Sequence, residues 1–310
     1  MVEEEGIGFE GARIRGVEGS NLPHFNSGHI IRLQNNGKIP MFDNNEKKFI
    51  ARVKTALGVS STTPRSYEEI FPNPPKEAVQ RILDRVDSRD SSQQQALLDQ
   101  LIEAGKPINL NVVAKKDIDA VTAAITDLVR EKQTEWGDQK QLAIWKHPLI
   151  EQLRLSDALA DQGVAVHDTA FTDTETKTEG RRRIREQIIA SFIGVTAANY
   201  CVADSATLVM KTKPGQARAA SLVPVIHIAV IYMDQILANL TELYARLKDD
   251  PDYSKTGITN CLTFISGPSK TADIEVVMVH GAHGPREVYL FVITSPQPET
   301  DEPSSHAAVP

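Results

Sequence analysis

The sequence predicts an α/β protein built on a mainly parallel β-sheet flanked by helices, with a helical portion ahead of it. After Trp136, short apolar runs alternate with helical patterns, which is typical of parallel sheets. The runs IAVI and YLFVI are apolar at every position, as expected for strands covered on both faces. The 41% hydrophobic and 24% charged composition is that of a soluble protein with a packed core.

The chain divides into three segments. Residues 1–45 hold seven of the eighteen glycines and have no sustained period, which predicts an irregular N-terminal arm. Residues 46–294 are periodic and form the main domain, with a helical portion over 46–135 and a sheet core over 136–294. Residues 295–310 are polar and proline-rich, which predicts a disordered tail.

Apolar residues at helical spacing predict four helices in the helical portion. They cover Glu46–Leu57, Pro75–Asp87, Gln93–Glu103 and Asp117–Gln133. Ser66 and Glu69 have the spacing of a capping box.

In the sheet core, β-type runs are bounded by helical patterns or turn residues. The predicted strands cover 141–145, 164–168, 200–210, 223–231, 261–266 and 287–294. The predicted helices cover Leu149–Asp161, Arg181–Ile193 and Met233–Lys248.

Charge and cysteine content narrow the function classes. The chain has 41 acidic and 34 basic residues, a formal charge of −7 and a pI near 5.7, which argue against nucleic-acid and anionic-membrane binding. Its only cysteines, Cys201 and Cys261, cannot hold an iron–sulfur cluster or a cysteine zinc site, so we expect no cofactor on this chain.

The first residues lack a signal-peptide pattern and the apolar stretch Ser221–Met233 is too short to span a bilayer, so we expect a cytoplasmic protein.

Two motifs have ordinary explanations. Gly6-x-Gly8-x-x-Gly11 has the spacing of a dinucleotide fingerprint, but it lacks the preceding strand and the following helix that such a site requires. A run of arginines at a predicted helix start binds an anion, or else pairs with the acidic residues before it or is simply solvated. The arginines are Arg181, Arg182, Arg183 and Arg185, and the acidic residues are Asp173, Glu175 and Glu179.

The segment Ile265–Glu275 is a candidate anion site. A strand ends at Ser266, Gly267 and Pro268 make a turn, and an apparent helix follows. This order of elements forms the ligand crevice of doubly wound sheets, where hydroxyls and backbone N–H groups face an anion. The candidate ligand residues are Ser266, Gly267, Ser269, Lys270, Thr271 and Asp273; alternatively, the hydroxyls and Asp273 only cap the helix.

The segment Val279–Val292 is the second candidate. Gly281 and Gly284 allow close backbone approach, and Arg286 supplies a fork of donors beside the next strand. His280 and His283 are a ligand pair without a third member, so we assign no metal. His283 is a candidate substrate contact or else a structural histidine.

The third candidate is the polar patch in Tyr200–Met210. Asp204, Ser205 and Thr207 interrupt an apolar run, so they either close a hairpin or line a cavity. Asp204 is the one carboxylate that we nominate for proton transfer.

Together, these segments resemble the lactate-utilization (LUD) domain family over roughly residues 46–294. The matching stretches are Gly194-Val195-Thr196 with ADSATLVM (203–210); Arg218, Ser221, Pro224 and His227; GPSKTADIE (267–275); and GAHGPRE (281–287). The family often has Glu-Thr-Gly-Thr where this chain reads Asp204-Ser205-Ala206-Thr207. If that glycine needs a positive φ, Ala206 changes the pocket.

The resemblance implies the sugar-phosphate isomerase and CoA-transferase-like α/β fold. It also implies a non-redox subunit of a complex that oxidises L-lactate to pyruvate with iron–sulfur partner proteins, binding a small carboxylate or phosphate. Arg218 joins the candidate ligand residues, or else holds a loop by hydrogen bonds. The alternatives are a stand-alone enzyme on a phosphorylated or CoA-linked substrate and an interaction module that docks a partner through the arm. The sequence leaves open whether this chain performs chemistry itself.

Overall fold

The computed structural model describes residues 44–56, 58, 75–134, 139–250, 262–272, 278–280 and 283–297. The chain forms two compact units, Met1–Pro72 and Asn73–Pro310. Helix α1 (Asn44–Ala56) belongs to the first unit and confirms the helix predicted there. The predicted arm, the Ser66/Glu69 capping box and most of the predicted tail lie outside the described residues.

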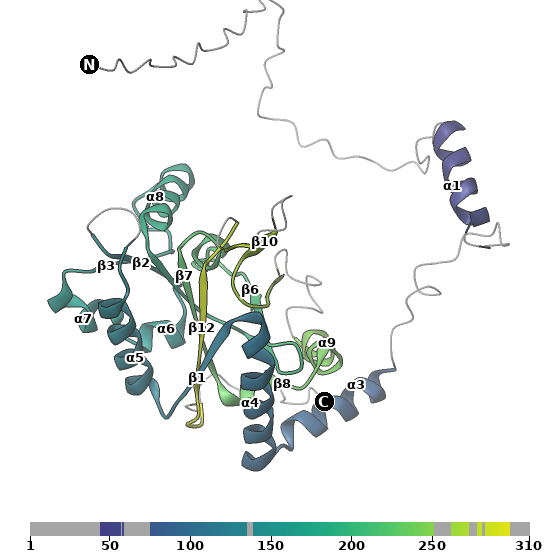
Figure 1. The fold of residues 1–310 in the computed structure, drawn as a ribbon, viewed down its shortest axis with the longest axis horizontal. Helices are drawn as coiled ribbons and strands as arrows, with labels where there is room; N and C mark the ends of the chain where they lie inside the picture. The colour runs from purple at the N-terminus through teal and green to yellow at the C-terminus, as the bar shows by residue number, and fades with distance from the viewer. Residues whose placement is uncertain are drawn as a thin grey trace, which may run out of the picture. The chain divides into compact units, whose positions relative to one another are not determined.

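The second unit is built on a six-stranded sheet in which every neighbouring pair is parallel, as predicted (Figure 1). The strand order is β1-β12-β7-β4-β2-β3. The strands are β1 (Leu110–Lys115), β2 (Gln141–Ile144), β3 (Ala165–Asp168), β4 (Ile193–Ala197), β7 (Ile226–Tyr232) and β12 (Glu287–Ile293). Strands far apart in the sequence thus lie side by side, and β12 inserts between β1 and β7.

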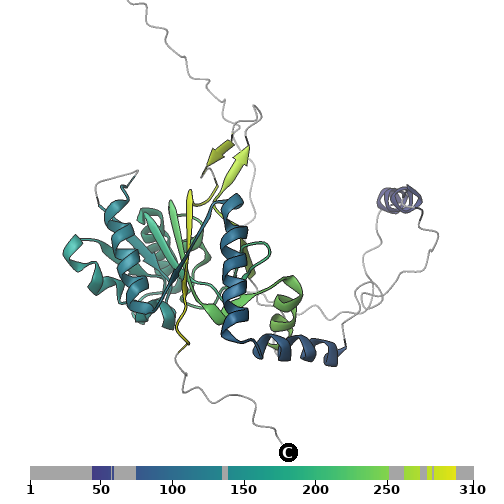
Figure 2. The same cartoon turned by 60° about the horizontal axis from the view of Figure 1, so that its bottom comes forward.

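One face of this sheet packs against short and long helices (Figure 2). They are α5 (Ile118–Glu131), α6 (Pro148–Gln152) and α7 (Leu155–Ala158), with the 3₁₀ turn η2 (Ala160–Gln162) following. Alternate strand residues such as Ile193, Val195, Ile226 and Ile228 are fully or almost fully buried on this face. Because successive side chains of a strand point to opposite faces, every second residue of each apolar run packs under these helices.

The other face packs against two helices and a second sheet. The helices are α4 (Ser91–Gly105), which leads through η1 (Lys106–Ile108) into β1, and α8 (Lys177–Ala190). The second sheet has the order β8-β5-β6-β9 and consists of β5 (Tyr200–Val202), β6 (Thr207–Lys211), β8 (Ile236–Leu237) and β9 (Leu262–Ile265). Strand β6 is antiparallel to both β5 and β9.

Strand β6 is buried on both faces, which explains its unbroken apolar run. Leu208 and Met210 face the large sheet, whereas Val209 joins a cluster with α3 (Lys76–Asp87) and α9 (Leu240–Asp249) on the outer side. Within the described part of the second unit, the layers are therefore helices, the parallel sheet, the smaller sheet with α4 and α8, and an outer helical pair (Figures 1 and 2).

The structure corrects four sequence-based assignments. The stretch 46–135 was expected to be helical, yet it contains β1, whose residues pair in register with β12. The predicted helix Leu149–Asp161 is broken because Arg154 has a φ of +46°. Ile193 begins β4 rather than ending a helix. Met233–Lys248 begins with η4 (Met233–Gln235) and β8, and its helix starts at Leu240, where the Asn239 side chain accepts hydrogen bonds from the first turn.

A buried ion pair joins the α3–α4 junction to α9. The Arg89 guanidinium lies 2.6 Å from a carboxylate oxygen of Glu242, whose other oxygen accepts a hydrogen bond from the Ala238 amide. The two side chains are 11% and 4% exposed, so both charges are largely removed from water.

Replacing Arg89 with alanine is expected to lower the free energy of unfolding by about 2 kcal/mol, because Glu242 would be left buried without its cation. Glu242 keeps the Ala238 amide as a partner, so the expected loss is smaller than for a charge stripped of every contact. Urea denaturation measures it. Arg85→Ala, on the exposed side of α3, is the control, and an equal effect of both changes would contradict the buried-pair explanation.

Candidate functional site

The polar patch in Tyr200–Met210 closes the hairpin between β5 and β6. Asp204 and Ser205 are exposed at this turn, and the buried Ala206 has a φ of +46°. The family position that often holds glycine is therefore left-handed here, a conformation that an alanine side chain disfavours by about 1–2 kcal/mol. The Asp204 carboxylate is exposed, and its role in proton transfer stays a prediction.

Thr207 connects this turn to the segment after β9. Its hydroxyl oxygen lies 3.0 Å from the Ser205 hydroxyl and 2.8 Å from the Ser266 hydroxyl. The pairing of Leu208 with Ile265 fixes this approach, because it sets the register of β6 against β9. Residues 59 positions apart thus contribute to one row of hydroxyls.

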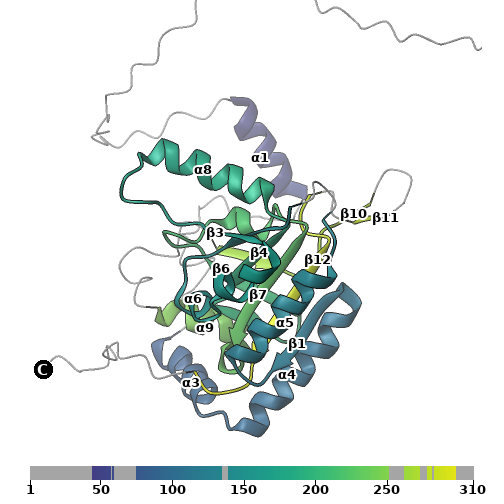
Figure 3. The ribbon, with the colours of Figure 1, turned by 90° about the vertical axis from the view of Figure 1, so that its left-hand side faces the viewer.

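The bend after β9 does not lead into a helix, contrary to the prediction. Lys270–Ala272 forms strand β10, which pairs with β11 (Met278–His280) in an antiparallel hairpin (Figure 3). Neither a helix-terminal anion site nor a helix cap therefore exists at these residues. Gly267 has a φ of +79°, and a Cβ there would overlap the Ile108 carbonyl oxygen, so this turn requires glycine.

The 266–272 bend lies directly against the bend before β12. The Ser269 amide donates a 2.8 Å hydrogen bond to the Pro285 carbonyl, and a Cβ on Gly284 would lie 3.2 Å from the Ser269 Cβ. The Arg286 amide in turn donates to the Val225 carbonyl, just before β7. The structure thus brings together segments that the sequence separates by many residues.

We call this group, consisting of Ser205, Thr207, Ser266, Ser269, Gly284 and Arg286, the amino-edge cluster. The name reflects its position: Arg286 and Val225 precede β12 and β7, so the cluster lies where these parallel strands begin. The sequence prediction placed the bend after Ser266 at the end of a strand of the doubly wound sheet, where such sheets form their ligand crevice. That placement is wrong, because β9 belongs to the second sheet and delivers the chain to the edge where β7 and β12 begin.

The remaining candidate residues are less closely tied to the cluster. Lys270 and His283 are exposed on the segments that carry it, and Thr271 is described only as part of β10. Arg218 is exposed at the start of η3 (Arg218–Ser221), where its carbonyl accepts a hydrogen bond from the Ser221 hydroxyl. Asp273 and Gly281 lie outside the described residues.

Sequence reasoning missed a polar group next to Arg286. Glu287 accepts hydrogen bonds from the Lys132 ammonium at 2.5 Å and from the Tyr289 hydroxyl at 2.6 Å. Burial alone would raise the pKa of Glu287, but these two hydrogen bonds hold it below its usual value. Lys132 lies 155 positions before Glu287 in the sequence, so no local pattern predicts this group.

Two of the sequence motifs pack against each other rather than around a ligand. Gly194 lies directly under η3, because a Cβ there would overlap the Ala220 carbonyl and approach Pro224 to 3.1 Å. The Thr196 hydroxyl lies 2.8 Å from Nε2 of His227, which is completely buried. Burial lowers the pKa of His227 to about 3, so this histidine is neutral near pH 7 and cannot act there as a cation.

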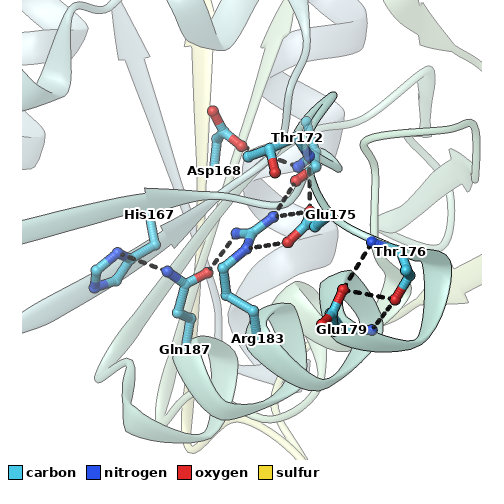
Figure 4. Close-up of polar contacts among 9 residues, drawn as sticks. His167, Asp168, Thr172, Glu175, Thr176, Glu179, Arg183 and Gln187 are labelled. Atoms are coloured by element: carbon cyan, nitrogen blue, oxygen red, sulfur yellow. Dashed lines mark hydrogen bonds and ion pairs between the residues drawn. The ribbon is translucent and has the colours of Figure 1, made fainter.

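One member of the arginine run, Arg183, pairs with an acidic residue that precedes the helix. Arg183 forms a bidentate pair with Glu175, donates to the Ala170 carbonyl and contacts Gln187, which reaches His167 (Figure 4). Hydrogen bonds from Arg183 are the main reason that the pKa of Glu175 falls to about 2. The ion-pair explanation is therefore confirmed for Arg183.

The described residues offer no cluster of three or more His, Cys, Asp or Glu side chains that could hold a metal ion. Cys201 is fully buried, and burial raises the pKa of its thiol, which disfavours the reactive thiolate. Among the helices that the structure describes, none is both long and apolar enough to cross a bilayer.

Comparison with known proteins agrees with the motifs. A protein named lactate utilization protein C from Halalkalibacterium halodurans is 31% identical over 181 residues, covering 58% of this chain and 72% of that protein. One of the same name from an Exiguobacterium species is 33% identical over 175 residues, covering 54% and 72%. A crystal structure of a DUF162 family protein from Deinococcus radiodurans aligns over 66% of this chain and 99% of its own, with 15% identity and a TM-score of 0.42. The model of the LUD domain matches residues 98–293, more than half of the sequence, and the chain therefore belongs to the LUD domain family.

Proposed function

We propose that this protein is a subunit of an L-lactate utilization system and that its amino-edge cluster binds a small carboxylate. The observation that carries the proposal is the meeting of Thr207, Ser266 and the Ser269–Arg286 segment at one sheet edge, in a chain whose relatives are named lactate utilization protein C. Hydroxyl groups and a guanidinium are suitable donors to a carboxylate, and Arg286 can bind it through two parallel hydrogen bonds.

Oxidation of L-lactate to pyruvate removes two electrons and two protons from the substrate. The cysteine content supplies too few thiolates for an iron–sulfur cluster on this chain, so in our proposal the electrons pass to iron–sulfur partner proteins. This chain would hold the carboxylate and organise the complex, without a cofactor of its own and in the cytoplasm.

The proposal has a cellular test. Deleting the gene is expected to abolish growth on L-lactate as the sole carbon source, and the full-length protein is expected to co-purify with iron–sulfur proteins. Growth of the deletion strain at the wild-type rate on L-lactate would contradict the proposal.

Ligand binding is tested separately by calorimetric titration of the full chain with L-lactate, pyruvate and inorganic phosphate. Arg286→Gln is expected to weaken lactate and pyruvate binding about tenfold, the loss of one charge-assisted contact. Ser266→Ala removes one neutral hydrogen bond, so a loss of about threefold to fivefold is expected.

The matched control is Arg130→Gln, an exposed arginine on α5 whose partner is Asp127. It is expected to leave binding unchanged. Binding of phosphate without lactate or pyruvate would instead support an enzyme acting on a phosphorylated substrate. Equal binding by Arg286→Gln and the wild-type protein would remove the amino-edge cluster from the proposal.

A further inference from the structure

A cavity of about 530 Å³ runs along α8. Its other wall is the chain from Thr212 to Val223, between β6 and β7. The volume is in the range of small-molecule sites. None of the amino-edge cluster residues lines it, so it is a separate site.

The lining combines a mostly apolar wall with cations. Phe171, Ile189 and Val223 are about half exposed or more, at 49%, 62% and 49%, although large apolar side chains are normally buried. Arg181, Arg185 and Lys213 also line the cavity, and no carboxylate does. Such a lining is complementary to a molecule with an apolar body and a negative charge.

The two ends of the cavity differ. Gly180 lies against Phe171, and the Thr169 hydroxyl donates a 2.6 Å hydrogen bond to the Gly215 carbonyl, so the first turn of α8 and the segment around Gly215 both adjoin residues 169–171. Arg181 and Lys213, which line the cavity, are sequence neighbours of these contacts. The Thr212 hydroxyl oxygen, in this part of the lining, is buried and has no hydrogen-bond partner within the described structure. This end therefore offers charge and an unused hydroxyl to an anionic group.

The other end is apolar. Ile189 and Val223 line it and also border a smaller neighbouring cavity of about 310 Å³. From Arg181 to Ile189 the helix rises about 12 Å, which is close to the length of an extended chain of about ten carbons. The cavity is thus elongated, with its charged and apolar features separated along its length.

We propose that this cavity binds a medium-chain carboxylate, with its headgroup near Thr212, Arg181 and Lys213 and its acyl chain directed toward Ile189 and Val223. The apolar surface of the acyl chain covers the exposed apolar side chains of the cavity. The ligand carboxylate accepts a hydrogen bond from the Thr212 hydroxyl. This binding is independent of the lactate proposal, since the two sites share no residue.

Calorimetric titration of the full-length protein with decanoate tests the proposal, with acetate and decanol as comparators that carry only the charge or only the chain. Decanoate is expected to bind at least tenfold more tightly than either. The double variant Arg181→Gln/Lys213→Gln is expected to weaken decanoate binding about tenfold and to leave decanol binding unchanged. Ile189→Asn, at an exposed position that tolerates a polar side chain, is expected to weaken both about fivefold.

Arg182→Gln is the matched control, because Arg182 is exposed on the same helix and does not line the cavity. Arg286→Gln is the second control and separates this site from the amino-edge cluster. Undetectable decanoate binding, equal affinity for decanol, or equal affinity of the double variant and Arg182→Gln would each overturn the proposal. Binding of an acidic amphipathic peptide but not of decanoate would assign the cavity to a protein partner and would overturn it too.

Discussion

Replacing Gly194 with alanine is expected to lower the free energy of unfolding by at least about 3 kcal/mol. Gly194 lies in the buried strand β4, and its Cα faces η3 at a distance that leaves no room for a methyl group. The added Cβ would overlap the carbonyl oxygen of Ala220 and lie 2.9 Å from its carbonyl carbon. Both are backbone atoms, so no side-chain rotation relieves the overlap, and η3 would have to move away from the sheet.

Chemical denaturation monitored by circular dichroism measures this effect. Gly180→Ala is the control, because its Cβ would meet only side chains, the exposed Phe171 ring and the Glu175 carboxylate. The exposed Phe171 ring can rotate, whereas the Glu175 carboxylate is held by Arg183 and would have to shift. Alanine favours the interior of α8, so a smaller loss of about 1–2 kcal/mol is expected. A Gly194→Ala variant as stable as Gly180→Ala would show that η3 is not packed on β4 as described.

The fold class was predictable because it depends on periodicity, which is a local property. The runs of β2, β3, β7 and β12 are apolar and bounded by turn residues or helices, and the structure confirms each of them within a few residues. Strand β1 escaped prediction because its neighbours in sequence are helices on both sides, while its partner β12 lies more than 170 residues later. Pairing between such distant segments leaves no local pattern.

The same reasoning explains the errors at the candidate site. Ser266, Gly267 and Ser269 resemble the start of a helix, and the antiparallel pairing with Met278–His280 makes the following residues a strand. The hydroxyl row of Thr207 and Ser266 depends on the register of β6 against β9, which the sequence does not specify. The sequence identified the polar residues of the candidate site from their local chemistry. The end of the strands at which they lie follows only from the sheet topology.

The stability of this protein is expected to fall steeply with acid because of His227. Its side chain is completely buried on the face of β7 that lies under the second sheet, with Nε2 held by the Thr196 hydroxyl and Nδ1 without a hydrogen-bond partner in the described structure. Burial lowers its pKa from 6.5 to about 3 in the folded state. Between these pH values the unfolded chain binds a proton that the folded protein does not, so lowering the pH favours unfolding.

The magnitude follows from the difference in pKa. The contribution of His227 is complete above pH 6.5 and is lost progressively below it, by about 2 kcal/mol at pH 5 and about 3 kcal/mol at pH 4. Glu175 does not contribute to the loss between pH 7 and pH 5, because its pKa is lowered from 4.5 to about 2 and its own stabilisation is lost only at lower pH. Burial raises the pKa of Asp234, which acts in the opposite sense as the pH falls, so a comparison with a histidine variant is needed to isolate the share of His227.

Urea denaturation of His227→Gln at both pH values measures the effect, since each variant is compared with itself and any loss of packing cancels. The variant is expected to lose about 2 kcal/mol less than the wild-type protein between pH 7 and pH 5. His147 also has a lowered pKa, mainly from burial and partly from Lys213, so His147→Gln measures its separate share. Identical pH dependence of His227→Gln and the wild-type protein would mean that His227 is reachable by water.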